Sequence, residues 1–145
     1  MSRPERSRRS DYRHFTALTT RWADNDVFGH VNNVMYYNWF DTAVTGHLLA
    51  KGLIDPMHGA VQTLVVETGC SYFASVAFPD KIDIGIAVTH LGTSSMRYAI
   101  GIFREGEDLA SAQGFFVHVS VARATGRPIE IPPALRSGLE AIHRS

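Results

Sequence analysis

Apolar and polar residues alternate with a period of two along most of the second half of the chain. The pattern is clearest at 81–91, where isoleucine and valine alternate with mainly polar or small residues. The stretches 62–76, 96–103 and 109–122 show the same alternation. A period of two with one apolar face is typical of antiparallel strands that bury that face. Short turn-forming segments separate the stretches, so we expect four strands in a meander.

The first half has a different pattern. From about 33 to 51, apolar residues recur at spacings of three and four, which predicts a helix with a wide apolar face. Gly52 provides a suitable end for it. Residues 15–22 are rich in threonine and aromatic side chains and predict a strand before this helix. A short amphipathic helix is expected at about 133–143.

Together these elements predict an α+β fold. A sheet with one apolar face needs a cover, and the helix at 33–51 is the only large apolar element available. We therefore expect an antiparallel sheet of about five strands wrapped around a long central helix. The outer face of the middle strands carries small residues at Gly85, Ala87, Ala99 and Gly101. They would let a second subunit pack closely, or they are ordinary variation among strand residues.

Length and charge narrow the possible classes of protein. The 145 residues are enough for one domain with a proper core. Lys and Arg total 14 and Asp and Glu total 14, a balance that argues against a binder of duplex nucleic acid. Residues 1–12 are locally basic, and we expect a flexible tail there, followed by a single domain at 13–145. No apolar run reaches membrane-spanning length, so we expect no membrane partner.

Cys70 is the only cysteine and lies on the apolar face of an expected strand. One cysteine can form neither an internal disulfide nor a metal site of several thiolates. We expect an inert core thiol, because no histidine stands at an obvious partner position. The composition suits a reducing compartment, and we expect a cytoplasmic protein.

The polar stretch DNDVFGHVNN, residues 24–33, directly precedes the apolar helix. Such residues are typical of caps and turns, which need no catalytic role. They also fit catalysis, because a carboxylate can attack a carbonyl or activate water while free amides at a helix start stabilise the oxygen as it gains charge. Gly29 would allow the sharp turn between acid and helix. Of the two acids, Asp24 better fits a structural cap and Asp26 better fits chemistry.

The segment RWADNDVFGHVNNVMYYNWFDTA, residues 21–43, resembles the signature of hotdog-fold acyl-CoA thioesterases of the 4-hydroxybenzoyl-CoA thioesterase type. The matching features are two acids two residues apart, a glycine three residues later, HVNN and a tyrosine-rich helix. The order of elements extends the resemblance over about 13–131, and GRPIEIPPALR resembles the usual ending of the family. The resemblance implies a hotdog fold and a homodimer whose sheets join edge to edge, and it leaves open whether dimers pair into a tetramer.

The resemblance also implies an activity, the hydrolysis of acyl-CoA thioesters without a metal or redox cofactor. The pantetheine arm of the substrate would lie in a channel at the dimer interface. Asp26 would be the catalytic nucleophile or general base, and the backbone amide of Asn33 would face the thioester carbonyl. The other residues expected to contact substrate are Gly29, Val31, Asn32, Tyr36, Ser94, Ser95 and Arg97. The aromatic residues expected to line the acyl site are Tyr36, Tyr37, Trp39, Phe40, Tyr72 and Phe73, which suit fatty and aromatic acyl groups alike.

Several alternatives remain open at this stage. His30 is a second candidate base, or it donates to the loop backbone. Asp24, Asp26 and His30 are all ligand types for a metal, although no helical histidine pair or CxxC motif supports such a site. Some family members carry a basic run near the CoA nucleotide where this chain has GTSS, so Arg123 and Arg127 are alternative sources of charge or ordinary surface residues. The competing functions are an acyl-binding protein and a hydratase, and the acid–histidine pair usual in hydratases is not evident.

Overall fold

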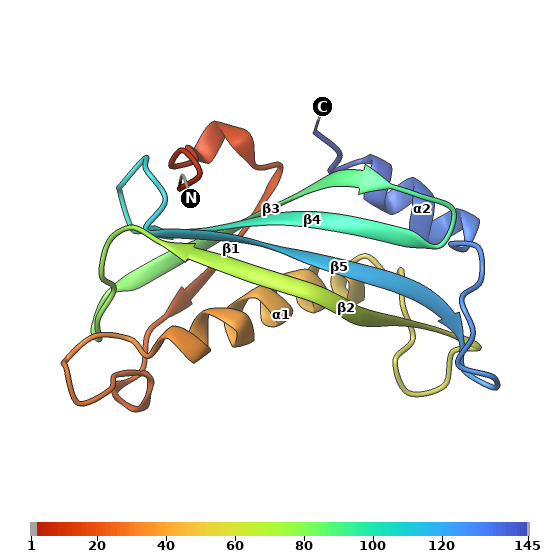
Figure 1. The fold of residues 1–145 in the computed structure, drawn as a ribbon, viewed down its shortest axis with the longest axis horizontal. Coiled ribbons are helices and arrows are strands. Elements are labelled where there is room, and N and C mark those ends of the chain that lie inside the picture. The colour runs from red at the N-terminus through yellow and green to blue at the C-terminus, as the bar shows by residue number, and fades with distance from the viewer. Residues whose placement is uncertain (1–2, 145) are drawn as a thin grey trace.

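The computed structural model describes residues 3–144, which form a five-stranded sheet and two α-helices. The elements are, in chain order, β1 (His14–Thr19), α1 (Asn33–Ala50), β2 (Val61–Tyr72), β3 (Lys81–Leu91), β4 (Ser95–Arg104), β5 (Ala112–Ala122) and α2 (Pro133–Glu140). Two 3-10 helices, Arg9–Asp11 and Trp22–Asp24, flank β1. Figure 1 shows α1 beneath the sheet and the N-terminal segment on the opposite side. The expected α+β hotdog architecture is confirmed.

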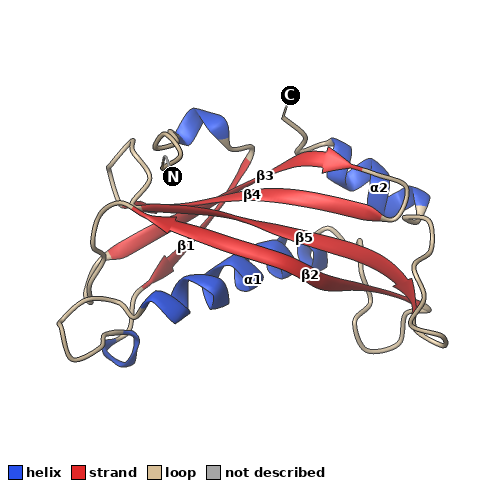
Figure 2. Ribbon diagram, viewed as in Figure 1, coloured by secondary structure: helices blue, strands red, loops and turns tan. Residues whose placement is uncertain are grey.

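The sheet is antiparallel throughout, with the strand order β1-β3-β4-β5-β2. The prediction of a four-stranded meander is right for β3, β4 and β5 but wrong for β2, which lies at the far edge beside β5 (Figure 2). Residues 73–80 make the crossing possible. Eight residues can span roughly 26 Å, whereas three inter-strand spacings measure only about 14 Å. β1 and β2 therefore form the two edges of the sheet.

α1 is the centre of the hydrophobic core. Its buried residues pack against the inner faces of β3, β4 and β5. The core residues of α1 are Tyr36, Trp39, Phe40, Ala43, Val44 and Leu48. Burial on several sides explains why the apolar positions of this helix form no narrow stripe. No helix among residues 3–144 is long and apolar enough to span a membrane.

β2 departs from the simple alternation expected at 62–76. A β-bulge between Val65 and Glu67 shifts the pairing with β5, so the residues before and after it change phase relative to the core. As a result Leu64 and Val66, expected on the apolar face, are 45% and 60% exposed. Val65 is also exposed, which makes this edge of the sheet apolar.

Residues 3–12 pack against the protein, which differs from the flexible tail expected at 1–12; residues 1–2 lie outside the described part. Arg8 pairs with Leu109, and the Arg9 guanidinium contacts the Asp83 carboxylate at 2.9 Å. The Tyr12 ring is buried over Gly85 and Gly101, where an added Cβ would lie only 2.6–2.9 Å from ring or Cβ atoms of Tyr12. The basic composition of this segment suggested flexibility. In the structure, its arginines instead donate to carbonyls and a carboxylate of the domain.

The small outer-face residues therefore serve a contact within the chain. Tyr12, Ala87, Phe103 and Ala110 form a second, smaller buried cluster, with Ala99 packed against it. The sequence left open whether these small residues allow a second subunit to pack closely or are ordinary variation. At Gly85 and Gly101, the space is filled instead by the chain's own N-terminal segment.

The C-terminal segment extends the sheet edge beyond the short strand β1. The Val88 amide donates to the Ile142 carbonyl at 2.9 Å, and the Arg144 amide donates to the Val88 carbonyl at 2.9 Å. α2 precedes this segment and buries Leu135 and Leu139 in the core. The end of β3 is thus covered by α2 and the residues that follow it.

Candidate functional site

The loop before α1 contains a tight turn that starts at Asp26. The Gly29 amide donates to the Asp26 carbonyl at 3.1 Å, and the Asp26 amide donates to the His30 carbonyl at 2.9 Å. Gly29 has a φ of 79°, a conformation that glycine adopts without strain. The Asp26 carboxylate accepts a hydrogen bond from the Phe28 amide at 2.9 Å. The turn therefore fixes the direction of the Asp26 side chain.

The flanks of this turn are tied to the rest of the protein. Asn25 forms a β-bridge with Val31, and the Val31 amide donates to the Val76 carbonyl at 2.7 Å. The Asn25 side-chain oxygen accepts from the Phe78 amide at 3.1 Å. These bonds join the loop to the segment after β2, so both segments are positioned together.

Asp24 occupies a structural position. Its side chain is 1% exposed and accepts hydrogen bonds from the Arg21 amide at 2.7 Å and the Arg21 guanidinium at 2.8 Å. Its carbonyl accepts from the Asn32 amide at 2.9 Å. The carboxylate is thereby committed to holding the loop, the arrangement expected of a turn residue.

The start of α1 offers a free backbone donor. Asn32 is the N-cap, and its side-chain oxygen accepts from the Val34 amide at 3.0 Å. Within residues 3–144, the Asn33 amide has no acceptor. It stands at the positive end of the helix dipole. The Asn33 carbonyl accepts from the Tyr72 hydroxyl at 2.9 Å, which links the helix start to the end of β2.

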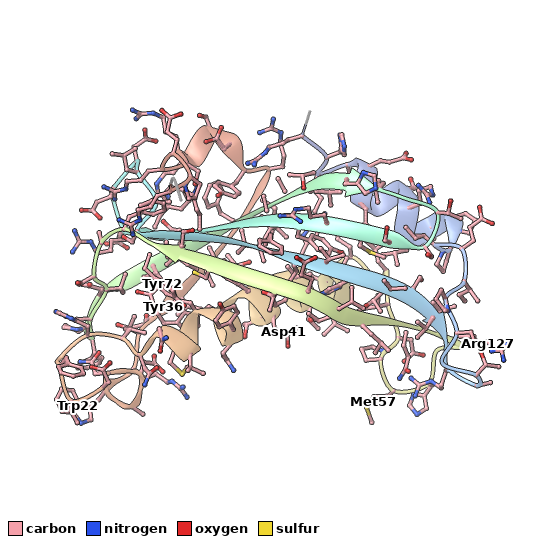
Figure 3. All side chains as sticks on the ribbon, in the orientation of Figure 1. Trp22, Tyr36, Asp41, Met57, Tyr72 and Arg127 are labelled. Atoms are coloured by element: carbon pink, nitrogen blue, oxygen red, sulfur yellow. The ribbon has the colours of Figure 1, made fainter. Side chains whose placement is uncertain are left out.

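Asp26 and Asn33 line one cavity of about 410 Å³. Its walls come from the loop, the first turn of α1 and the segment after β2. The other lining residues are Phe28, His30, Val31, Tyr36, Tyr72, Phe73, Ala74, Ser75 and Val76. Figure 3 shows Tyr36 and Tyr72 beside each other at this end of α1. Their rings meet edge to face with centroids 4.9 Å apart, which gives the cavity an aromatic wall.

Burial keeps the aromatic hydroxyls and the thiol near this cavity protonated. Burial, with a smaller contribution from Cys70, raises the pKa of Tyr36 to about 12. Burial raises the pKa of Tyr72 as well, and it raises the pKa of Cys70 to about 11. At neutral pH the two tyrosines are therefore neutral donors. Cys70 remains a thiol, which suits the inert role expected for it.

The structure brings together only some of the residues that the sequence predicted to contact the substrate. Asp26, His30, Val31, Asn33 and Tyr36 line the cavity, whereas Gly29 and Asn32 shape its loop and helix start. Of the expected aromatic lining, Tyr72 and Phe73 are present, but Trp39 and Phe40 are buried in the core. Sequence reasoning missed Phe28, and it missed residues 74–76 because the crossing after β2 was not foreseen.

Ser94, Ser95 and Arg97 lie far from Asp26 within one chain. Ser95 pairs with Val119 and Tyr72 pairs with Ala112, so seven residues of β5 separate the two positions, or about 23 Å. The Arg97 guanidinium stacks on the Phe115 ring at 4.0 Å. These three residues join the cavity only if a second chain supplies them.

The two alternative arginines also lie away from the cavity. Arg123 donates to the Gly59 carbonyl at 2.6 Å and so holds the loop before β2. Arg127 is exposed at the opposite end of the molecule from Trp22 and the loop that follows it (Figure 3). Neither contacts Asp26 or the lining of its cavity.

Within residues 3–144, no cluster of three His, Cys, Asp or Glu side chains has the arrangement of a metal site. The proposed ligands Asp24, Asp26 and His30 are not gathered, because the Asp24 carboxylate is bonded to Arg21. His30 is exposed at the cavity mouth, and its backbone carbonyl accepts from Asp26.

Similar structures share this architecture over almost the whole chain. The PA5185 protein from Pseudomonas aeruginosa strain PAO1 is 49% identical, with a TM-score of 0.94 over 97% of this chain and 99% of that one. A 1,4-dihydroxy-2-naphthoyl-CoA thioesterase from Synechocystis is 16% identical, with a TM-score of 0.80 over 86% and 93%. The gentisyl-coenzyme A thioesterase BH1999 is 21% identical, with a TM-score of 0.76 over 88% and 99%.

The family assignment follows from the sequence match that accompanies this shared fold. Residues 20–139, which include the Asp26 loop, α1 and the sheet from β2 to β5, match the model of the thioesterase-like superfamily. The resemblance seen in the sequence motif is thereby confirmed. The chain belongs to the thioesterase-like superfamily, a family of thioester hydrolases of the hotdog fold.

Proposed function

We propose that the protein hydrolyses acyl-CoA thioesters at the cavity lined by Asp26 and Asn33. The observation that carries the proposal is that a carboxylate and an unpaired helix-start amide line one aromatic-walled cavity. Ester-type hydrolysis requires these two groups, one to deliver the attack and one to stabilise the oxyanion. The membership of the thioesterase-like superfamily supports the same reaction.

In this proposal Asp26 acts on the thioester carbonyl, directly as a nucleophile or as a base that activates water. The hydrogen bond from the Phe28 amide holds the Asp26 carboxylate in place for either role. The Asn33 amide donates to the carbonyl oxygen as its negative charge grows. Tyr36 and Tyr72 shape the apolar wall, and the sulfur leaves as the CoA thiol.

The assembly that we propose is a homodimer joined through β2. This strand is an open sheet edge with Leu64, Val65 and Val66 exposed, and such an edge favours pairing with a second chain. A partner chain is also the source from which Ser94, Ser95 or Arg97 could reach the substrate.

The acyl group that we propose is apolar and either aromatic or aliphatic. The aromatic wall supports this class of substrate. Two structures of the same fold are thioesterases for aromatic acyl-CoA substrates, which makes aromatic acyl groups the first to test.

The test is a panel of aromatic and fatty acyl-CoAs, with release of the free CoA thiol followed by a thiol reagent. Turnover of at least one substrate that depends on Asp26 is expected. Binding of acyl-CoAs with no thiol release by the folded protein would favour the acyl-binding alternative. Addition of water to an enoyl-CoA without thiol release would favour a hydratase.

A further inference from the structure

A second cavity lies near the other end of α1, enclosed by the start of β1, the last turn of α1, Leu53 and one side of α2. Its volume is about 530 Å³. His47 on its wall follows Asn33 by fourteen helical residues, which places it about 21 Å along the helix from the candidate active site. The two cavities share no lining residue.

The charged residues that line this cavity are all basic or imidazole side chains. His14 begins β1 and Arg13 precedes it, whereas His47 lies in the last turn of α1 and Lys51 is the C-cap of that helix. The lining includes no Asp or Glu. Within residues 3–144, Lys51 has no ion pair, and Arg13 donates only to the backbone carbonyls of Ser10 and Tyr12. The positive charge is therefore uncompensated.

The His47 side chain is largely buried, and its imidazole has no hydrogen-bond partner among residues 3–144. It is 6% exposed, and no side chain or carbonyl among residues 3–144 bonds to its imidazole. Its ring centroid lies 4.3 Å from that of His14, which is also unbonded. The ring nitrogens of His47 are not fully buried, so they remain open to a ligand in the cavity.

The dipole of α1 accounts for only part of this basic group, because two of its four members lie outside α1 and its C-cap. Cations near a helix C-terminus are stabilised by the free carbonyls of the last turn. The carbonyls of His47, Leu48 and Leu49 already accept from the amides of Lys51, Leu53 and Gly52. Moreover, Arg13 and His14 belong to the segment at the start of β1 and not to α1.

We propose that this cavity binds a small organic anion, with a carboxylate or phosphate head between His47, His14 and Lys51 and an apolar body against Leu53 and α2. The apolar side of the cavity is formed by Leu53, Ala134, Ala141 and Ile142. A charged head beside a short apolar wall fits an amphiphilic anion better than a bare inorganic ion. Arg13 adds a further charge at the rim.

Binding of an anion in this cavity should be accompanied by protonation of His47. Burial, His14 and Lys51 together hold the pKa of His47 below its ordinary value, so its imidazole is neutral at neutral pH. An anion beside the ring favours the protonated form and raises that pKa, so affinity increases as the pH falls. The titratable groups that line the cavity with His47 are Arg13, His14 and Lys51, and the lining residues of α2 are not titratable.

The test is an NMR titration of the protein with labelled histidines at about pH 6 and about pH 8. The probes are hexanoate and phenyl phosphate, with neutral hexanamide as the control. Binding is expected to shift the His47 and His14 signals, and the affinity should be higher at the lower pH. The probe that binds more tightly identifies the preferred head group as carboxylate or phosphate. The proposal is overturned if neither anion moves these signals, if hexanamide binds equally well, or if affinity does not increase at lower pH.

A matched pair of variants locates the site. The chain has two lysines, and Lys51→Gln removes the one that lines the cavity, whereas Lys81→Gln removes one elsewhere. Both are exposed, so both variants should fold. Lys51→Gln should weaken anion binding about fivefold or more, a loss of roughly 1 kcal/mol. Equal affinities in the two variants would refute the assignment. The readout involves no hydrolysis, so it is independent of the proposed thioesterase activity.

Discussion

At the scale of single residues, two aspartates two positions apart occupy different environments. Asp24 is buried and bonded to the Arg21 amide and guanidinium, whereas Asp26 lines a cavity and accepts one bond from the Phe28 amide. The bonds of Asp24 to Arg21 fit the structural role expected for it from the sequence. The catalytic role of Asp26 stays a prediction.

The first prediction concerns Asp24. Asp24→Asn replaces an acceptor oxygen with a donor that faces the donors of Arg21, so the loop should lose stability but keep its chemistry. We expect a loss of about 1 kcal/mol in the free energy of unfolding, as for a weakened cap. Urea unfolding measures the loss, and acyl-CoA hydrolysis should be mostly retained. Wild-type stability together with lost turnover would instead make Asp24 the catalytic residue.

At the scale of elements, the residue pattern predicted where the helix and strands lie along the chain. It did not predict every pair of strands that are neighbours in the sheet. β3, at Lys81–Leu91, coincides with the stretch of clearest alternation. Adjacent strands with short links were expected to pair, but the crossing at 73–80 carries β2 to the other edge. The bulge between Val65 and Glu67 also exchanges which alternate residues of β2 face the core. A prediction from strict alternation assumes that the same alternate residues face the core along the whole strand. Residues 74–76 line the cavity because of this crossing, so sequence reasoning could not place them.

The second prediction concerns the packing of the N-terminal segment on the sheet. In Gly101→Ala, the added methyl would lie 2.6 Å from the Tyr12 ring and 2.8 Å from Phe103. We expect a loss of about 1–3 kcal/mol in unfolding free energy, the usual cost of overpacking. Gly46→Ala is the matched control, because its methyl meets nothing within 4 Å on α1 and should stabilise the helix by up to about 1 kcal/mol. Equal thermal unfolding of both variants would show that Tyr12 does not cover Gly101.

At the scale of the whole molecule, one chain presents a candidate site at one end of α1 and an open edge at β2. Its Ser94 and Ser95 stand about 23 Å from that site. A single sequence can suggest a second chain through its family resemblance, but it cannot show the contact. The family itself is recognisable because the Asp26 motif and the order of elements occur together.

The third prediction is that activity requires the dimer. Sedimentation at micromolar concentration should give the mass of two or four chains, because the apolar edge at Leu64, Val65 and Val66 favours pairing. Dilution that dissociates the assembly should reduce turnover per chain in parallel. A monomer with full turnover would contradict this prediction.

The fourth prediction concerns metals. Hydrolysis should persist in EDTA, because the proposed chemistry needs only the Asp26 carboxylate and the Asn33 amide. Activity is measured before and after prolonged dialysis against the chelator. A loss that a single added metal ion restores would replace the Asp26 mechanism by a metal-assisted one.

The most direct test is the rate of acyl-CoA hydrolysis by Asp26→Asn on the best substrate of the panel. Asparagine keeps the oxygen that accepts from Phe28 but removes the charge that a nucleophile or base requires. Asp108→Asn, which removes an exposed carboxylate elsewhere, is the control. We expect Asp26→Asn to lower turnover by about a hundredfold or more with acyl-CoA binding little changed, whereas Asp108→Asn should keep the wild-type rate. A folded, dimeric Asp26→Asn protein with a near wild-type rate would show that this loop only caps the helix.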